Sequence, residues 1–488
     1  MELDLVVSGG TVVTAIDAVQ CDVGIRDGRI AALGAGLGSA RARIDATGKL
    51  VLPGGVEGHC HVEQRTAFGM MNADDFYSAT VSAAFGGTTT ILPFAAQQRG
   101  DCLRQVVAEY HERARPKAVI DYGFHLIVSD PTEEAIRSDL PKLIDEGITS
   151  FKVFMTYERL KLADRQILDV METARRHGAM LMIHAENNDM IQWLSGRLLA
   201  NGHSQPRYHA VSHPRLAEGE AAGRAIALAE LMDVPILIVH VSTAQAMDAI
   251  RGAQTAGLKV YAETCPQYLF LTSDDLDRQG MEGAKFCCSP PPRDRHTQEE
   301  IWRGLRNGTF QVFSSDHSPF RHDQTGKLSA GPAAAFHQIP NGVPGIELRL
   351  PLLFSEGVGK GRIDLHQFVA LTATNPAKLY GLHPRKGAIA VGADADIAIW
   401  DPDVERVVRA DILHDNVGYT PYDGMVLRGW PVQVLSRGRL VVDAGVLKAD
   451  RGSGMFVPRT RSPSARPLGR LVPELDPARN FGARLLQG

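Results

Sequence analysis

The character of the chain changes within residues 52–61, which read Leu52-Pro53-Gly54-Gly55-Val56-Glu57-Gly58-His59-Cys60-His61. Before this stretch, short β-type runs at 3–8, 11–13, 21–26 and 29–33 alternate with Gly-Gly and Asp-Gly turns, which predicts a small sheet. After it, apolar strands alternate with longer helical patterns, which is typical of βα units around a parallel sheet. The stretch therefore marks the start of an α/β domain.

Eight strands are predicted in this α/β domain, at 55–61, 88–94, 122–128, 150–155, 180–184, 236–240, 260–264 and 312–316. Helical patterns separate them, for example at 73–85, 164–177, 218–231 and 245–257. Eight such units predict a closed (β/α)8 TIM barrel. A doubly wound open sheet is the alternative.

The β pattern returns near the end of the chain, at 396–400, 405–408, 425–427, 432–436 and 439–442. Neither terminal segment has enough apolar strands for an independent sandwich, but together they can bury one shared face. We therefore predict a small β-sandwich made of 1–53 and 379–452, with the barrel inserted as 54–378. Residues 453–488, rich in Pro, Arg, Ser and Gly, predict an irregular tail that covers a neighbouring surface or interface or is disordered.

Composition excludes several classes of protein. The net charge of −4 offers no basic surface for nucleic acid, and no apolar run approaches the roughly 20 residues that span a bilayer. The first residues lack the pattern of a secretory signal, so we expect a cytoplasmic protein. The six cysteines have no CxxC spacing and are expected to be reduced thiols.

Four histidines end three of the predicted strands. His59 and His61 alternate at the end of the first strand, so both point into the barrel mouth, while His184 and His240 each end an apolar strand. Taken alone, the His59 and His61 pair is as compatible with two polar residues at a strand end as with a metal site. A single histidine at the end of a strand more often has a structural role. Together they converge on the mouth where catalytic groups of such barrels gather.

Two further residues join this cluster. Asp316 ends the last strand, where it is a metal ligand and proton carrier or, alternatively, a helix cap, and His317 is expected to support rather than bind. Lys152 lies within an apolar strand, where a lone ammonium is costly to bury. It either pairs with a carboxylate or, as a neutral amine, takes up carbon dioxide and becomes an anionic carbamate.

Four imidazoles, a carbamylated lysine and a carboxylate supply ligands for two divalent ions. These nitrogen and oxygen donors suit zinc and tolerate manganese or cobalt. Such ions lie roughly 3.5 to 4 Å apart, generate hydroxide near neutral pH and polarise a carbonyl. The cluster thus predicts hydrolysis of an amide.

With these residues, the chain resembles the dihydropyrimidinase and D-hydantoinase branch of the amidohydrolase superfamily over nearly its whole length. Beyond the ligands, the resemblance rests on Ala73-Asp74-Asp75-Phe76-Tyr77, Gly86-Gly87-Thr88-Thr89, Phe151-Lys152-Val153-Phe154-Met155-Thr156-Tyr157, Glu263-Thr264-Cys265-Pro266-Gln267-Tyr268-Leu269, Cys288-Ser289-Pro290-Pro291 and Ile339-Pro340-Asn341-Gly342. Several independent blocks in one order make the match specific. It implies two zinc ions, one held by His59, His61, Lys152 and Asp316 and the other by Lys152, His184 and His240.

The resemblance also implies a reaction, in which a hydroxide bridging the two metals opens a dihydropyrimidine or 5-substituted hydantoin ring to an N-carbamoyl amino acid. Asp316 would act as general base and then general acid, and Tyr157 would donate a hydrogen bond to the oxyanion. Backbone groups at Ser289 and Asn341 would bind the edge of the cyclic ureide or imide. The alternatives are a packed ring for Tyr157 and turn chemistry for Ser289 and Asn341. A homotetramer or homodimer is expected by analogy.

The chain departs from the family pattern at several positions. Glu57 and Cys60 stand where an aspartate and a threonine are usual, and Pro93 where an aspartate precedes an aromatic residue. In the substrate loop 62–71, Arg65 is predicted to contact a polar or anionic exocyclic group, together with Gln64. Phe68 is predicted to form an apolar wall with Met70 and Met71. The alternative is that these side chains face solvent.

Sibling activities remain open at this point. Dihydroorotases usually carry an arginine where Glu63 stands, and allantoinases tend to have a histidine where Gln267 stands, whereas nothing in the sequence excludes a cyclic imidase. A different class, the collapsin response mediator proteins, keeps the fold as a non-catalytic scaffold without the metal ligands. All six ligand positions are filled here, which favours an enzyme.

Overall fold

Eight parallel strand positions curl around one axis in the computed structural model, which describes residues 2–66 and 69–486. In sheet order these are β8 (Gly55–Cys60), β9 (Thr88–Ala96), β10 (Asp121–Tyr122) with β11 (His125–Ile127), β12 (Ser150–Phe154), β13 (Met180–His184), β14 (Ile236–Ile238), β15 (Val260–Thr264) and β16 (Val312–Phe313). A parallel bridge between Cys60 and His317 joins the first position to the last, and the His61 N–H donates to the His317 carbonyl over 2.7 Å. The predicted (β/α)8 barrel is confirmed, and the open sheet is wrong because the strand order follows the chain.

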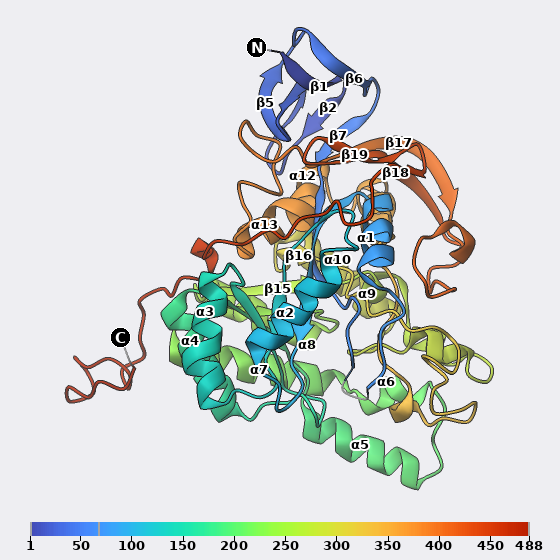
Figure 1. Cartoon of the computed structure of the whole chain (residues 1–488). Coiled ribbons are helices and arrows are strands. Elements are labelled where there is room, and N and C mark those ends of the chain that lie inside the picture. The colour runs from blue at the N-terminus through green and yellow to red at the C-terminus, as the bar shows by residue number, and fades with distance from the viewer. Residues whose placement is uncertain (1, 67–68, 487–488) are drawn as a thin grey trace.

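Helices surround the barrel (Figure 1). They are α1 (Phe76–Phe85), α2 (Leu103–Ala114), α3 (Leu140–Asp145), α4 (Asp164–His177), α5 (Asn188–Ala200), α6 (Tyr208–Ser212), α7 (Arg215–Met232), α8 (Ala244–Thr255), α9 (Gln267–Phe270), α10 (Arg295–Arg306), α11 (Arg349–Leu353), α12 (Leu365–Val369) and α13 (Asn375–Leu379). Single π or 3-10 turns are η1 (Ala135–Asp139), η2 (Ser273–Leu276), η3 (Glu282–Phe286), η4 (Phe336–Gln338), η5 (Phe354–Val358), η6 (Ala370–Thr374), η7 (Ala410–Ile412) and η8 (Pro463–Ala465). None of the described helices combines the length and apolar character needed to cross a membrane.

Local chemistry explains where some of these helices begin. The expected helix 73–85 starts at Phe76, because the Asp75 side chain accepts from the Tyr77 and Ser78 N–H groups and caps the first turn. Helix α4 has the expected bounds. Helix α5 was not expected, and it projects on the side of the barrel opposite the N-terminal strands (Figure 1).

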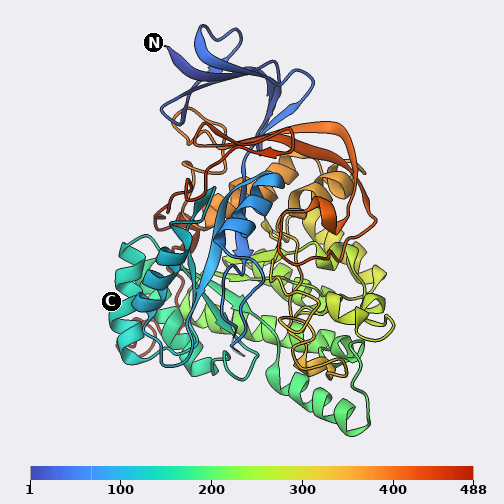
Figure 2. The same ribbon diagram turned by 45° about the vertical axis from the view of Figure 1, so that its right-hand side comes forward.

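The two ends of the chain pair in one sheet. Its order is β20 (Val446–Leu447), β19 (Arg439–Asp443), β18 (Val426–Ser436), β17 (Ile397–Val407), β7 (Leu50–Pro53), β2 (Thr11–Val13) and β3 (Ala18–Gln20). A second sheet has the order β5 (Arg29–Gly34), β4 (Asp22–Arg26), β1 (Leu3–Ser8) and β6 (Ala40–Asp45). Figures 1 and 2 show both sheets at the same end of the barrel. Val23 and Ile25 from the second sheet share a buried cluster with Val51 and Ile397 from the first, so the predicted sandwich is confirmed.

Some strands differ from the prediction for physical reasons. The expected strands 396–400 and 405–408 form one strand, β17, whose register shifts between Asp401 and Glu405 interrupt the alternation. Strands β3 and β6 were missed because they are edge strands whose side chains are largely exposed, so they carry no apolar alternation. We retain the boundaries 53/54, 378/379 and 452/453 as a proposal.

The tail that follows residue 452 packs against the barrel. The Tyr122 N–H donates to the Met455 carbonyl (2.9 Å), and the Val457 N–H donates back to Tyr122 (2.7 Å). The buried guanidinium of Arg459 donates to Ser150 Oγ (2.6 Å) and to the Phe124 carbonyl.

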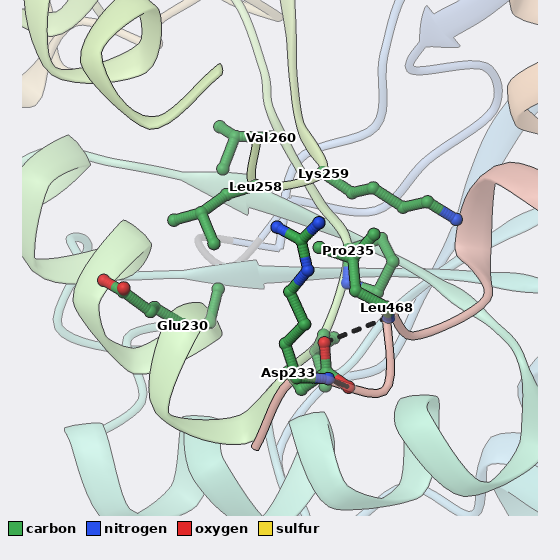
Figure 3. A pocket seen from close by; sticks show the side chains of 10 residues that line it. Glu230, Asp233, Pro235, Leu258, Lys259, Val260 and Leu468 are labelled. Carbon is green, nitrogen blue, oxygen red and sulfur yellow. Dashed lines mark hydrogen bonds between the residues drawn. The ribbon is translucent and has the colours of Figure 1, made fainter. Parts of the chain in front are cut away.

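Further along, the tail crosses the end of α7. There the Asp233 carboxylate accepts from the N–H groups of Leu468 (3.0 Å), Gly469 (2.8 Å) and Arg470 (3.2 Å). Figure 3 shows Leu468 over Asp233, beside a hollow of about 20 Å³, which has room for little more than one water molecule. This part of the tail therefore acts as a strap over the barrel.

Replacing Arg459 by methionine is expected to destabilise the protein by about 2 kcal/mol, because two buried acceptors lose a charged donor. Thermal unfolding measures the loss as a lower midpoint. The control is Arg461→Met, which removes a surface ion pair with Asp145 and is expected to cost less than about 1 kcal/mol. Equal midpoints for the two variants would show that the tail contributes no stability through Arg459.

Candidate active site

A cavity of about 630 Å³ opens at the carboxyl ends of the barrel strands. His61, Lys152, His184, His240 and Asp316 line it. His59 lies beneath them, fully buried. The structure thus brings all six predicted metal ligands to one place.

The facing atoms of these side chains are close together. His59 Nε2 and His61 Nε2 lie 3.1 and 3.4 Å from Asp316 Oδ1. His184 Nδ1 lies 2.8 Å from His240 Nε2. Ligand atoms of His59, His240 and Asp316 all lie within 4.8 Å of one another, so these residues belong to one candidate metal-binding cluster.

The remaining ring nitrogens of these histidines face side-chain oxygens, with one exception. These contacts join His59 Nδ1 to Glu263 Oε1 (2.6 Å), His61 Nδ1 to Gln64 Oε1 (2.7 Å) and His184 Nε2 to Glu186 Oε2 (2.8 Å). Such contacts fix the tautomer and orientation of metal-binding imidazoles. His240 Nδ1 is buried and has no partner among the described residues.

Lys152 makes no ion pair with a carboxylate among the described residues. Its Nζ lies 2.8 Å from His59 Nε2 and 4.4 Å from the centre of the Phe94 ring. Burial lowers the pKa of Lys152 to about 8. The buried Lys386 differs, because Asp121, Asp394 and Asp396 surround it. The salt bridge considered for Lys152 is therefore absent from the described structure, and burial favours the neutral form of its amine more than in an exposed lysine.

Three residues of the site adopt left-handed backbone conformations. Their φ angles are +67° for Tyr157, +40° for His240 and +46° for Asp316. Each such conformation costs on the order of 1–3 kcal/mol in a residue other than glycine and persists only where the surroundings enforce it. Asp316 is also held ionised: burial opposes this, but the charge of His59 and hydrogen bonds from His59 and His61 keep its pKa well below the usual range.

The predicted substrate-binding residues Tyr157, Ser289 and Asn341 line the same cavity. Asn341 Nδ2 donates to the Tyr157 hydroxyl over 3.4 Å, and Ser289 is also hydrogen-bonded to that hydroxyl. Ser289 Oγ donates to Glu186 Oε2 over 2.7 Å. The Tyr157 hydroxyl therefore faces two residues across the cavity rather than a purely local partner.

The residues of the predicted substrate loop lie in two different places. Gln64 and Met70 line the central cavity, whereas Arg65 is exposed and lines a neighbouring hollow of about 710 Å³. Phe68 lies outside the described residues. The geometry therefore gives no support to a contact between Arg65 and a molecule in the central cavity.

One departure from the family pattern is accommodated by a partner. The Glu57 carboxylate accepts from the His59 N–H (2.8 Å) and pairs with Arg349 Nε (3.0 Å), with both side chains fully buried. The longer acid therefore supports the strand that carries His59.

Sequence reasoning missed several residues of the site. Glu186 and Glu263 contact predicted ligands, and His209 and His213 line the cavity beside them. The available signal was a carboxylate at or just beyond the end of an apolar strand, as in Ile183-His184-Ala185-Glu186. The inner face of α5 also lines the cavity, through Ile191, Gln192, Ser195, Gly196 and Leu199.

Comparisons with known proteins agree on one family. The model of the amidohydrolase family matches residues 50–441. A D-hydantoinase of Rhizobium radiobacter is 44% identical over 94% of this chain and 99% of its own length. A D-hydantoinase of Geobacillus stearothermophilus is 46% identical over 93% and 96%. The crystal structure of a dihydropyrimidinase from Brevibacillus agri NCHU1002 superposes with a TM-score of 0.91 at 44% identity, covering 94% of this chain and 99% of that one.

Proposed function

Since the chain belongs to the amidohydrolase family, within the group of D-hydantoinases and dihydropyrimidinases, we propose that it hydrolyses an amide bond of a cyclic ureide. The substrate is a dihydropyrimidine or a 5-substituted hydantoin, and the product is an N-carbamoyl amino acid. One observation carries the proposal: six candidate metal ligands share a cavity with Tyr157, Ser289 and Asn341.

The side chains present fit a pair of divalent cations. His184 Nδ1 lies 2.8 Å from His240 Nε2, and Lys152 Nζ lies 2.8 Å from His59 Nε2, so potential nitrogen ligand atoms meet in two close pairs. Such nitrogens beside a carboxylate form a donor set typical of zinc and accepted by manganese or cobalt. We assign one ion to His59, His61, carbamylated Lys152 and Asp316, and the other to carbamylated Lys152, His184 and His240. When bound, the ions acidify water and polarise a carbonyl.

The residues of the chain perform the remaining steps. The Asp316 carboxylate takes the proton from water and delivers it to the departing ring nitrogen, so it acts first as base and then as acid. The Tyr157 hydroxyl donates a hydrogen bond to the carbonyl oxygen, where negative charge develops. Backbone groups at Ser289 and Asn341 bind the ureide edge and orient the ring.

Two rival functions are less well supported. Glu63, which stands where dihydroorotases carry an arginine, is paired with Lys117 at 2.7 Å and offers no cation to a substrate carboxylate. A scaffold role does not require the six-ligand cluster. We further propose a homotetramer or homodimer, by family resemblance, and a cytoplasmic location, which the six unpaired cysteines support.

The test compares dihydrouracil, 5-substituted hydantoins and a cyclic imide as substrates of the purified protein, with zinc measured on the same sample. We expect two zinc ions per chain and the highest kcat/KM for a ureide ring. Removing the metal with a chelator is expected to abolish turnover, and zinc with bicarbonate is expected to restore it. A higher kcat/KM for the imide would instead identify a cyclic imidase, and an inert, metal-free protein would identify a scaffold.

A further inference from the structure

Glu186 lies between the two halves of the site. It follows β13 by two residues, precedes α5, and its side chain is 1% exposed. A carboxylate has no proton to give, so Glu186 can only accept hydrogen bonds from its neighbours.

The first contact of this carboxylate fixes a metal ligand. Glu186 Oε2 lies 2.8 Å from His184 Nε2. Because the carboxylate only accepts, the proton of a neutral His184 lies on Nε2, which leaves the lone pair of Nδ1 directed toward His240. Glu186 thus selects the tautomer in which His184 can bind a cation through Nδ1.

The second contact reaches the substrate side of the cavity. The same oxygen accepts from Ser289 Oγ over 2.7 Å. Ser289 has one hydroxyl proton and gives it to Glu186, so in its hydrogen bond with Tyr157 the serine oxygen accepts and the Tyr157 hydroxyl donates. The Tyr157 oxygen in turn receives the Asn341 amide proton, so the Tyr157 hydroxyl is oriented as a donor.

We propose that Glu186 is a positioning residue that couples metal binding at His184 to the orientation of the Ser289 and Tyr157 hydroxyls. One oxygen atom makes both contacts, so a change that moves or neutralises this carboxylate disturbs both of them. Other buried carboxylates near the site do not join the two sides in this way: Glu263 contacts His59 and the backbone of His240. The inference rests on the proposed function for the role of Tyr157, but its metal-binding half does not.

A matched control exists in Glu218, which is also buried. It accepts from the Ser242 N–H (2.7 Å) and hydroxyl and pairs with Arg293 at 3.2 Å, without touching a candidate ligand. Glu218→Gln therefore removes the charge of a buried, serine-bonded carboxylate just as Glu186→Gln does. Any loss of stability that comes simply from neutralising a buried carboxylate is therefore expected in both variants.

The decisive experiment titrates the metal-free proteins with zinc in competition with a chromogenic chelator. Glu186→Gln is expected to weaken one of two zinc sites by about 10- to 100-fold, whereas Glu218→Gln is expected to bind both ions as the wild type does. Glu186→Asp, which keeps the charge, is expected to recover part of the affinity. Wild-type zinc affinity in Glu186→Gln, or equal losses in Glu186→Gln and Glu218→Gln, would overturn the proposal.

Kinetics on the best ureide substrate test the coupling to Ser289. Glu186→Gln and Ser289→Ala are each expected to lower kcat more than they raise KM, and the double variant is expected to lose less than the product of the two effects. Independent effects would refute the coupling. If Glu186→Gln does not fold, the charge-conserving Glu186→Asp takes its place in this double-mutant cycle. If the wild type opens no cyclic ureide, the proposed function fails, while the zinc titration still decides the role of Glu186 at His184.

Discussion

Replacing Asp316 by asparagine is expected to lower kcat for ring opening by about 10³-fold, because a neutral amide cannot carry the proton from water to the leaving nitrogen. Asparagine keeps the size of the side chain and tolerates the left-handed backbone that position 316 requires (φ +46°). The fold is therefore expected to survive, with a thermal midpoint close to that of the wild type. Steady-state kinetics on a hydantoin measure the loss.

Zinc content is determined on the same Asp316→Asn sample, so that a loss of proton transfer is told apart from a loss of metal. The control is Asp323→Asn, an aspartate that is hydrogen-bonded to Thr325 within its own exposed loop. It is expected to keep wild-type kcat. Turnover by Asp316→Asn within tenfold of the wild type would mean that another group carries the proton.

Replacing Lys152 by methionine is expected to remove both zinc ions and to lower turnover by about 10³-fold or more, because both proposed sites share this side chain. Methionine fits the apolar surroundings of the lysine, where Phe94 and Phe154 flank the amine. The readouts are zinc per chain and kcat. In the wild type, incubation with carbon-13 bicarbonate is expected to give a carbamate signal that Lys152→Met lacks.

Lys327 provides the control, because burial lowers its pKa to about 8 as well. Its Nζ donates to the carbonyls of Cys287 (2.7 Å) and Pro340 (2.6 Å), next to Ser289 and Asn341. Lys327→Met is therefore expected to raise KM while retaining both zinc ions. Two tightly bound zinc ions in Lys152→Met would refute the bridging carbamate.

The barrel could be predicted from the sequence because its strands are buried on both faces and read as apolar runs. The histidines and Asp316 were identifiable because each ends such a run. Glu186 and Glu263 were missed, since a carboxylate at or just beyond a strand end resembles ordinary loop polarity. Moreover, the contact of Glu263 with His59 joins strands at opposite ends of the barrel sequence. Helix α5 was not predicted because apolar residues such as Met190 and Trp193 lie on its exposed side and blur the amphipathic pattern. The contacts of Arg65 could not be predicted because loop geometry decides which way its side chain points.

Strand β7 lies between β2 and β17, where Leu50 pairs with Trp400. A ribosome synthesises Leu50 long before Trp400, and at about 5–20 residues per second the interval is on the order of tens of seconds. Throughout that interval β7 lacks the partner strand that later covers one of its edges, and an unpaired strand edge promotes aggregation. The β-sandwich can therefore be completed only late in translation. We expect chaperones to bind the amino-terminal strands more than the catalytic barrel.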